Sequence, residues 1–188
     1  MVERLNSFLE NTGLIPPLQF GFTAGRSTID AIKKVIVSVT RGRTLGTKCC
    51  LVALDIAGPF DNTWHPAVLA KLREQKCTSN IYLIIKDFLF NRKAFIRISD
   101  TENSKHVTKG SPQGPVPGPT LRNITISGLI ETISKVPNLE IVTYAEDILL
   151  IIHGPSHEAV ITSVEKSLNT IEEWCFEHKL ELSKDKRQ

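Results

Sequence analysis

The sequence predicts an α+β fold, in which an antiparallel sheet carries helices packed on one of its faces. Three observations support this prediction: several segments place apolar residues at helical spacing, others alternate or are short and apolar like strands, and one pair of strands is joined by a tight turn. The 188 residues, 41% of them hydrophobic, can bury one sizeable core, so we expect a single domain. The net charge of +3 is compatible with a nucleic-acid partner without requiring one.

An amphipathic helix is predicted over residues 27–40, STIDAIKKVIVSVT. Ser27 can cap this helix, with Asp30 three residues later, and Arg41-Gly42 supplies a stop signal. One helical face collects apolar residues at the expected spacing: Ile29, Ile32, Ile36 and Val39.

The next segment, CCLVALDI at residues 49–56, is predicted to be a buried strand that ends at a carboxylate, Asp55. A helix is expected from Pro66, whose fixed φ suits a first turn, to about Gln75. A further helix, NIYLIIKDFLF, is predicted to be capped by Asn80.

A pair of strands is predicted at residues 94–98 and 105–109, because AFIRI and KHVTK alternate. The sequence KGSPQGPVPGPT predicts a loop rich in glycine and proline, and a helix from about Leu121 to Lys135 follows it. A last amphipathic helix is marked by Val160, Val164, Leu168, Ile171 and Cys175.

Two apolar strands flank a polar step in NLEIVTYAEDILLIIHG, residues 138–154. The step contains two adjacent carboxylates, Glu146 and Asp147. They allow two interpretations, a metal-binding turn and an ordinary solvated hairpin turn.

No apolar stretch approaches the roughly 18 residues of a membrane span, and no secretory signal follows Met1. The cysteines lack zinc-site spacing and suit the reduced thiols of an intracellular protein: Cys49, Cys50, Cys77 and Cys175. We therefore expect an intracellular chain with no membrane partner. Neither the choice between nucleus and cytoplasm nor the oligomeric state is indicated.

Three separated features could form one site: Asp55, Gln113-Gly114 and Glu146-Asp147. Carboxylates at strand ends, far apart in sequence, are what a two-metal phosphoryl-transfer site needs, and Mg²⁺ prefers such hard oxygen ligands. Each feature alone also has an ordinary explanation, as a turn-forming aspartate, a surface loop or a solvated hairpin. Their joint occurrence and their order along the chain favour the metal-site interpretation.

Five segments in this order resemble the reverse transcriptase domain of non-LTR (LINE-type) retrotransposons, from about Leu5 to the C-terminus. They are QFGFTAGRSTIDAI, LVALDIAGPFDNTWHPAVLAKL, SPQGPVPGPTL, YAEDILLI and LELSKDK. The resemblance implies a right-hand polymerase fold, with part of the fingers at about 1–48 and mostly palm at about 49–188. It also implies that an upstream fingers segment and the thumb are absent from this chain.

The implied activity is RNA-directed DNA polymerisation with two Mg²⁺ ions, for which Mn²⁺ is a possible substitute. The implied partners are an RNA template, a DNA primer and deoxynucleoside triphosphates. Asp55, Glu146 and Asp147 match the family's catalytic metal ligands. Lys186 is similar to a late lysine placed near the leaving pyrophosphate as a proton donor.

Phe60 matches an aromatic residue that packs beneath the sugar and excludes a 2′-hydroxyl group, since a rigid ring leaves that group neither room nor a partner. Gln113 and Gly114 match the loop that lies against the incoming nucleotide. Arg26 matches a fingers segment near the template, although a solvated helix entry explains it equally well.

The chain departs from the family pattern at its turn, where Glu146 replaces an aspartate. The extra methylene lengthens the side chain by about 1 Å, and catalytic positioning is sensitive at that scale. Proline at positions 59, 115 and 117 removes backbone donors near the same site. These departures predict a large or complete loss of rate.

Three hypotheses therefore stand for this chain. The first is an RNA-directed DNA polymerase domain. The second is a catalytically dead retroelement remnant that is at most a weak nucleic-acid-binding module. The third, an α+β interaction domain with accidental motif matches, is disfavoured by five motifs in order.

Overall fold

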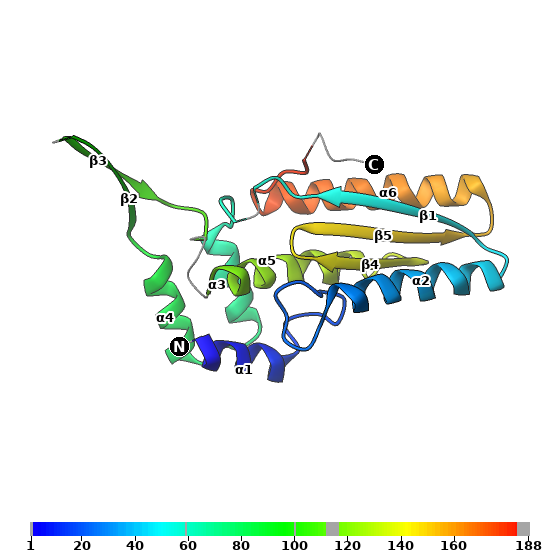
Figure 1. The fold of residues 1–188 in the computed structure, drawn as a ribbon, viewed down its shortest axis with the longest axis horizontal. Coiled ribbons are helices and arrows are strands. Elements are labelled where there is room, and N and C mark those ends of the chain that lie inside the picture. The colour runs from blue at the N-terminus through cyan, green and yellow to red at the C-terminus, as the bar shows by residue number, and fades with distance from the viewer. Residues whose placement is uncertain (1, 59, 100, 112–116, 184–188) are drawn as a thin grey trace.

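The computed structural model describes residues 2–58, 60–99, 101–111 and 117–183. A three-stranded sheet forms the centre, with helices on both sides and a helical group at one end (Figure 1). The sheet contains β1 (Lys48–Asp55), β5 (Asp147–Gly154) and β4 (Leu139–Tyr144), in the order β1-β5-β4, and both pairings are antiparallel.

Two helices, α5 (Pro117–Ile133) and α6 (His157–Glu177), cover one face of this sheet. Alternate strand residues form the core with them, among them Leu54, Ile141, Ile148, Leu150 and Ile152. This arrangement confirms the predicted antiparallel sheet with helices on one face. In addition, α2 (Thr28–Thr44) packs on the opposite face through Ala31, against Val142 and Ile151.

The helix α2 begins as predicted, because Ser27 and Asp30 form a reciprocal capping box. Most of its predicted apolar face does not meet the sheet: Ile29, Ile32 and Ile36 are 54–63% exposed, whereas half-buried Val39 does pack against the core on this face. The helix packs instead through a stripe of smaller residues, Ala31, Val35, Ser38 and Gly42.

Gly42, predicted as a stop signal, lies inside α2, which continues to Thr44. A β-carbon at Gly42 would lie 2.6 Å from the ring of His153, so glycine permits this close approach of helix and strand. Two lines of residues along α2 could have packed on the sheet: the large apolar residues around Ile32, and the smaller residues that include Ala31 and Gly42. Only the smaller residues let the helix come close to the strands.

The strand β1 was predicted to be buried, but only its last two residues, Leu54 and Asp55, are buried. Leu51 is 47% exposed. The prediction was wrong because α2 covers only part of its face of the sheet.

A second core joins α5 to three other helices at one end of the sheet: α1 (Val2–Thr12), α3 (His65–Glu74) and α4 (Ser79–Leu89). The sequence predicted α3 and α4 but not α1. The N-cap of α4 is Thr78 rather than Asn80, which lies in the first turn. Likewise, α5 begins at Pro117, earlier than the predicted Leu121.

The hairpin of β2 (Arg92–Ile98) and β3 (Thr101–Val107) projects from this end of the molecule, as Figure 1 shows. Two strands were predicted here, but β3 begins four residues before the predicted segment 105–109 and ends at Val107. The elements β4, β5 and α6 were also predicted. Within the described part of the chain, none of the helices combines the length and hydrophobicity that crossing a membrane requires.

Candidate active site

Asp55 and Asp147 lie directly opposite each other where β1 and β5 meet at one end of the sheet. Residues opposite each other in an antiparallel pair project from the same face, with Cβ atoms about 4.5–5.5 Å apart. Asp55 is 7% exposed, whereas Asp147 is exposed to solvent. The structure thus brings together two of the three predicted carboxylates, one held in the sheet and one open to solvent.

The turn that carries Asp147 is a two-residue hairpin loop, Ala145-Glu146, between the paired residues Tyr144 and Asp147. Ala145 has φ 49°, a left-handed conformation that costs a residue with a β-carbon about 1–2 kcal/mol. Glu146 is half-buried. The predicted tight turn is therefore present, in a strained form.

A loop from the N-terminal region supports this turn. The amide of Phe20 donates to Thr143 O (2.8 Å), and the amide of Thr143 donates to Leu18 O (2.9 Å), so the loop pairs with the edge of β4. A β-carbon at Gly21 would lie 2.1 Å from Ala145 N. Sequence analysis missed Gly21, although it lies within the motif QFGF.

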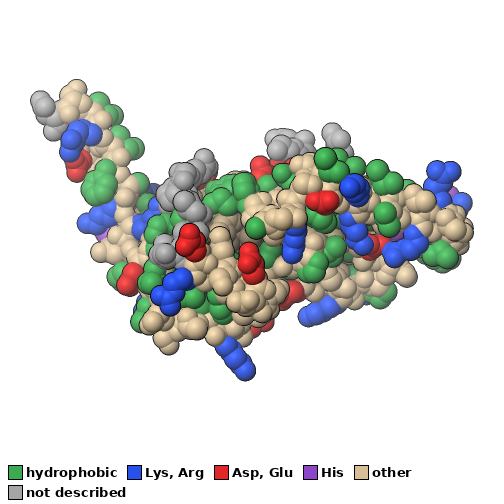
Figure 2. Space-filling model, turned by 60° about the horizontal axis from the view of Figure 1, so that its bottom comes forward, with side chains coloured by type: hydrophobic (Ala, Val, Ile, Leu, Met, Phe, Trp, Pro, Cys, Tyr) green, Lys and Arg blue, Asp and Glu red, His purple; other side chains and the backbone are tan. Residues whose placement is uncertain are grey.

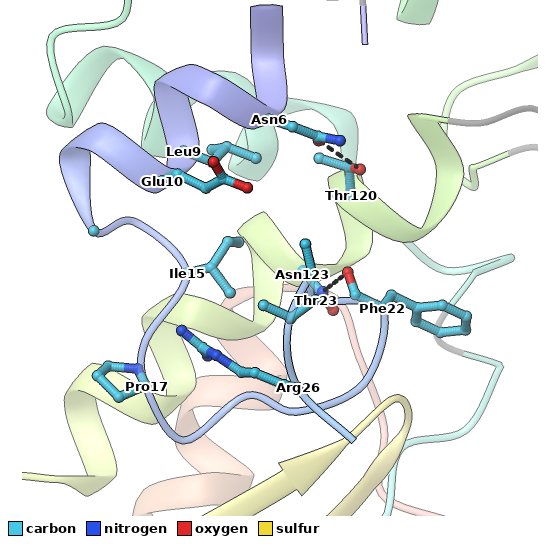
Figure 3. A pocket seen from close by; sticks show the side chains of 12 residues that line it. Asn6, Leu9, Glu10, Ile15, Pro17, Phe22, Thr23, Arg26, Thr120 and Asn123 are labelled. Carbon is cyan, nitrogen blue, oxygen red and sulfur yellow. Dashed lines mark hydrogen bonds between the residues drawn. The ribbon is translucent and has the colours of Figure 1, made fainter. Parts of the chain in front are cut away.

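Arg26 belongs to the same loop and holds it closed. Its Nη1 donates to Pro16 O (2.5 Å) and to Gln19 O (2.6 Å), and burial lowers the pKa of its guanidinium. Figure 3 shows the side chain running towards Pro17, within a pocket of about 350 Å³ between α1, the loop and α5. The position is compatible with a loop-holding role, and the predicted template contact stays a prediction.

Phe60 lies in the segment after β1 and meets the N-terminal loop through an edge-to-face contact with Phe22 (ring centroids 6.1 Å apart, planes at 80°). The amide of Ser111 donates to Phe60 O (2.7 Å), which attaches the start of the Gly/Pro-rich loop here. Gln113 and Gly114 follow shortly after Ser111 but lie outside the described residues.

The C-terminal segment pairs with the chain beside Asp55. The amide of Ser183 donates to Asp55 O (2.8 Å), and the amide of Ala57 donates to Glu181 O (2.8 Å). Lys186 lies three residues beyond Ser183, outside the described residues. Four of the five sequence motifs thus have described residues that meet around Asp55 and the β4–β5 turn, and the fifth is attached at Phe60.

Arg122, which sequence analysis missed, is buried in α5 with 1% exposure. In the orientation of the Gln19 amide that satisfies both of its ends, Nη1 of Arg122 donates to the amide oxygen (2.8 Å) and the amide nitrogen donates to Thr143 O (2.9 Å). Nε and Nη2 have no hydrogen-bond partner within the described residues. Its one signal in the sequence was that it is the sole charged residue between positions 117 and 130.

The charge of Arg122 is coupled to the carboxylates of the turn. Burial lowers the pKa of Arg122 to about 10. The negative charges that oppose this shift belong, largest first, to Glu146, Asp147 and Asp55. A buried cation therefore lies within electrostatic reach of all three predicted ligands.

The carboxylate pair lies at an apolar groove of about 500 Å³, bounded by α2 and by the ends of the three strands. Figure 2 shows the side of the molecule on which α1 and α2 lie, where Lys and Arg side chains are scattered among hydrophobic ones. The donor chemistry of Asp55 and Asp147 fits a hard divalent cation. Within the described ranges, however, no group of three histidine, cysteine or acidic side chains is arranged to hold a metal ion.

Comparison with protein families gives a match over residues 1–188 to the family described as reverse transcriptase (RNA-dependent DNA polymerase). Two similar Drosophila melanogaster proteins are a probable RNA-directed DNA polymerase from transposon BS (25% identity over 93% of this chain) and the RNA-directed DNA polymerase from mobile element jockey (27% over 99%). A third, a putative 115 kDa protein in type-1 retrotransposable element R1DM, is 30% identical over 85% of the chain. The chain spans 15–21% of the length of these relatives.

Among solved structures, the apo telomerase of Candida tropicalis truncated from its C-terminal domain has the same fold. The TM-score is 0.73 at 10% identity, over 100% of this chain and 39% of that one. The telomerase of Candida albicans, in complex with a fragment of telomeric RNA, matches with a TM-score of 0.60 at 13% identity, over 99% and 34%. The expected polymerase fold and the expected resemblance to non-LTR retrotransposon reverse transcriptases are confirmed.

Proposed function

Because the chain belongs to the reverse transcriptase family, we propose that it is the palm and adjoining fingers part of an RNA-directed DNA polymerase. The proposed reaction adds deoxynucleotides to a DNA primer that is paired with an RNA template. The two relatives from transposon BS and mobile element jockey carry this activity in their names, but this chain spans about a fifth of their length.

The observation that carries the proposal is the register of β1 and β5, which sets Asp55 opposite Asp147. We assign these two carboxylates to Mg²⁺, or to Mn²⁺ in its place. The bound metal supplies activation of the primer hydroxyl and charge neutralisation on the triphosphate. Asp55, fixed within the sheet, sets the position of the site, and exposed Asp147 completes it beside the groove.

The residues around the pair receive the nucleotide in this proposal. Phe60, at the attachment point of the Gly/Pro-rich loop, excludes a sugar with a 2′-hydroxyl group. Gln113 and Gly114 in that loop lie against the base pair being formed. Arg26 keeps the N-terminal loop closed on the side where we place the template. Lys186 protonates the leaving pyrophosphate.

Glu146 sets the rate in this chain. Its extra methylene displaces the carboxylate by about 1 Å relative to aspartate, a shift that can cost catalysis about a hundredfold. The second hypothesis, a catalytically dead remnant, draws support from the lack of a three-carboxylate group among the described residues. Both hypotheses share the same fold and differ in rate alone.

Primer extension tests the proposal. The chain is incubated with an RNA template, a labelled DNA primer, deoxynucleoside triphosphates and either Mg²⁺ or Mn²⁺. We expect slow extension that Asp55→Asn abolishes, with Glu177→Gln, a substitution at the end of α6, as the matched control that leaves it unchanged. Extension that survives Asp55→Asn contradicts the metal-ligand assignment, and no extension with either metal supports the remnant.

A further inference from the structure

Arg122 is a buried cation whose guanidinium group is only partly paired. Its side chain is 1% exposed, yet only Nη1 has hydrogen-bond partners in the described part of the chain. A buried charge normally requires close compensation, because removal from water costs several kcal/mol. Hydrogen bonds from Arg122 to Gln19 and from Gln19 to Thr143 O hold this charge beside the strand that leads into the turn, and the negative charges that act on it belong to Glu146, Asp147 and Asp55.

We propose that Arg122 is the built-in counter-ion of the Asp55–Glu146–Asp147 group and competes there with divalent cations. The inference rests on the proposed metal site at Asp55 and Asp147. It goes beyond that proposal by assigning a residue that lowers metal affinity and holds the acidic turn together without metal.

Neighbouring carboxylates, such as the opposed Asp55 and Asp147 and the adjacent Glu146, repel one another, and a fixed positive charge within electrostatic reach relieves that repulsion. The same fixed charge repels a divalent cation that approaches the carboxylates, and burial weakens the screening of this repulsion by water. Arg122 thus stabilises the metal-free turn and disfavours the metal-bound one.

A purely structural role predicts something different. The hydrogen bonds from Arg122 to Gln19, and from Gln19 to Thr143, tie α5 to the N-terminal loop and β4. If that tie were its whole function, replacing Arg122 would lower stability without tightening metal binding. Metal affinity therefore separates the two roles.

The first experiment titrates Mn²⁺ into the chain by calorimetry, without primer or nucleotide. We expect Arg122→Met to bind Mn²⁺ at least tenfold more tightly than wild type, and Arg122→Lys, which keeps the charge, to stay within about twofold. Adding Asp55→Asn to Arg122→Met removes the gain. Equal or weaker binding by a folded Arg122→Met overturns the proposal.

A second measurement leaves Arg122 intact, so it decides the matter even if its variants do not fold. Glu146→Gln and Asp147→Asn are unfolded by heat in the presence of a chelator. If Arg122 is the counter-ion, both substitutions lower the midpoint, because each removes a favourable partner. A raised midpoint means that repulsion among uncompensated carboxylates dominates, which overturns the proposal.

These outcomes are independent of polymerase activity. Tighter Mn²⁺ binding by Arg122→Met in a chain that never extends a primer supports the counter-ion role and removes the proposed function. Primer extension by the wild type, with no gain in Mn²⁺ affinity in Arg122→Met, supports the proposed function and overturns the counter-ion role.

Discussion

Gly21 lies against the backbone of Ala145, so closely that a β-carbon at Gly21 would stand 2.1 Å from Ala145 N and 2.8 Å from Ala145 Cα. The N-terminal loop and the turn bearing Glu146 and Asp147 are therefore in direct backbone contact. Because Ala145 already has a left-handed φ, the turn depends on this loop for its shape.

Gly21→Ala is expected to push the loop away from the turn. We expect a destabilisation of about 1–3 kcal/mol, the usual cost of an added methyl group in a packed site, and loss of primer extension. Urea unfolding measures the first effect. The matched control is Gly128→Ala in α5, where the nearest atom to the new β-carbon is 3.6 Å away and helix propensity favours alanine by up to about 1 kcal/mol. Equal effects of the two substitutions would rule out the steric explanation.

Glu146→Asp is expected to raise the rate of primer extension by about a hundredfold, because it restores the shorter carboxylate at the turn. Single-nucleotide incorporation under saturating Mg²⁺ measures this rate. Glu146→Gln shares the length of glutamate without its charge and should bring no gain. If Glu146→Asp changes nothing, the position of this carboxylate does not limit the reaction.

Phe60→Val is expected to lower the preference for deoxyribonucleotides over ribonucleotides at least tenfold, since the ring no longer fills the space of a 2′-hydroxyl group. The preference is measured as the ratio of the two kcat/KM values on the same primer. Phe176→Val on α6, where the ring is 76% exposed, is the control and should leave the ratio unchanged. An unchanged ratio in Phe60→Val would remove Phe60 from the sugar-binding site.

Glu140 joins β4 to α2 and makes the fold sensitive to acid. Burial raises the pKa of its carboxyl, but a hydrogen bond and ion pair with Lys34 (2.7 Å) and a hydrogen bond from Ser38 (2.6 Å) outweigh burial. The ion pair with Arg41 acts in the same direction. The pKa in the folded protein therefore lies below its ordinary value of 4.5.

A carboxyl group whose pKa is lowered by folding stabilises the fold at pH values above its ordinary, unfolded-state pKa. This contribution is lost as the pH falls through the pKa of the folded state. Glu140→Gln should cost about 1.5–3 kcal/mol at pH 7, the usual contribution of hydrogen bonds to a charged group. The difference from wild type should shrink steadily below pH 4.5. Urea unfolding at several pH values checks this, and a difference that is constant down to pH 3 would contradict it.

Local signals predicted much of the fold. Residues 138–154 contain two apolar stretches separated by one short polar step, and they form β4, β5 and the two-residue loop between them. Ser27 and Asp30 marked the start of α2, because a capping box depends on a few neighbouring residues.

Features that depend on distant neighbours were not predictable in this way. The sequence contains two adjacent stripes along α2, and the position of His153 decides that the one containing Gly42 packs. Arg122 is the clearest case for the site, since only the folded chain brings its charge close to Glu146 and Asp147. The family resemblance matched Asp55 and Asp147 to metal ligands but assigned no role to Arg122.

We propose that Asp55 and Asp147 form the metal-binding pair of a polymerase palm. Crystals soaked in excess MnCl₂ test it most directly, through the anomalous scattering of manganese. We expect a manganese peak bound by the carboxylates of Asp55 and Asp147, at about the 2.0–2.2 Å typical of small divalent cations. Manganese bound at other carboxylates, with none between Asp55 and Asp147, would contradict it.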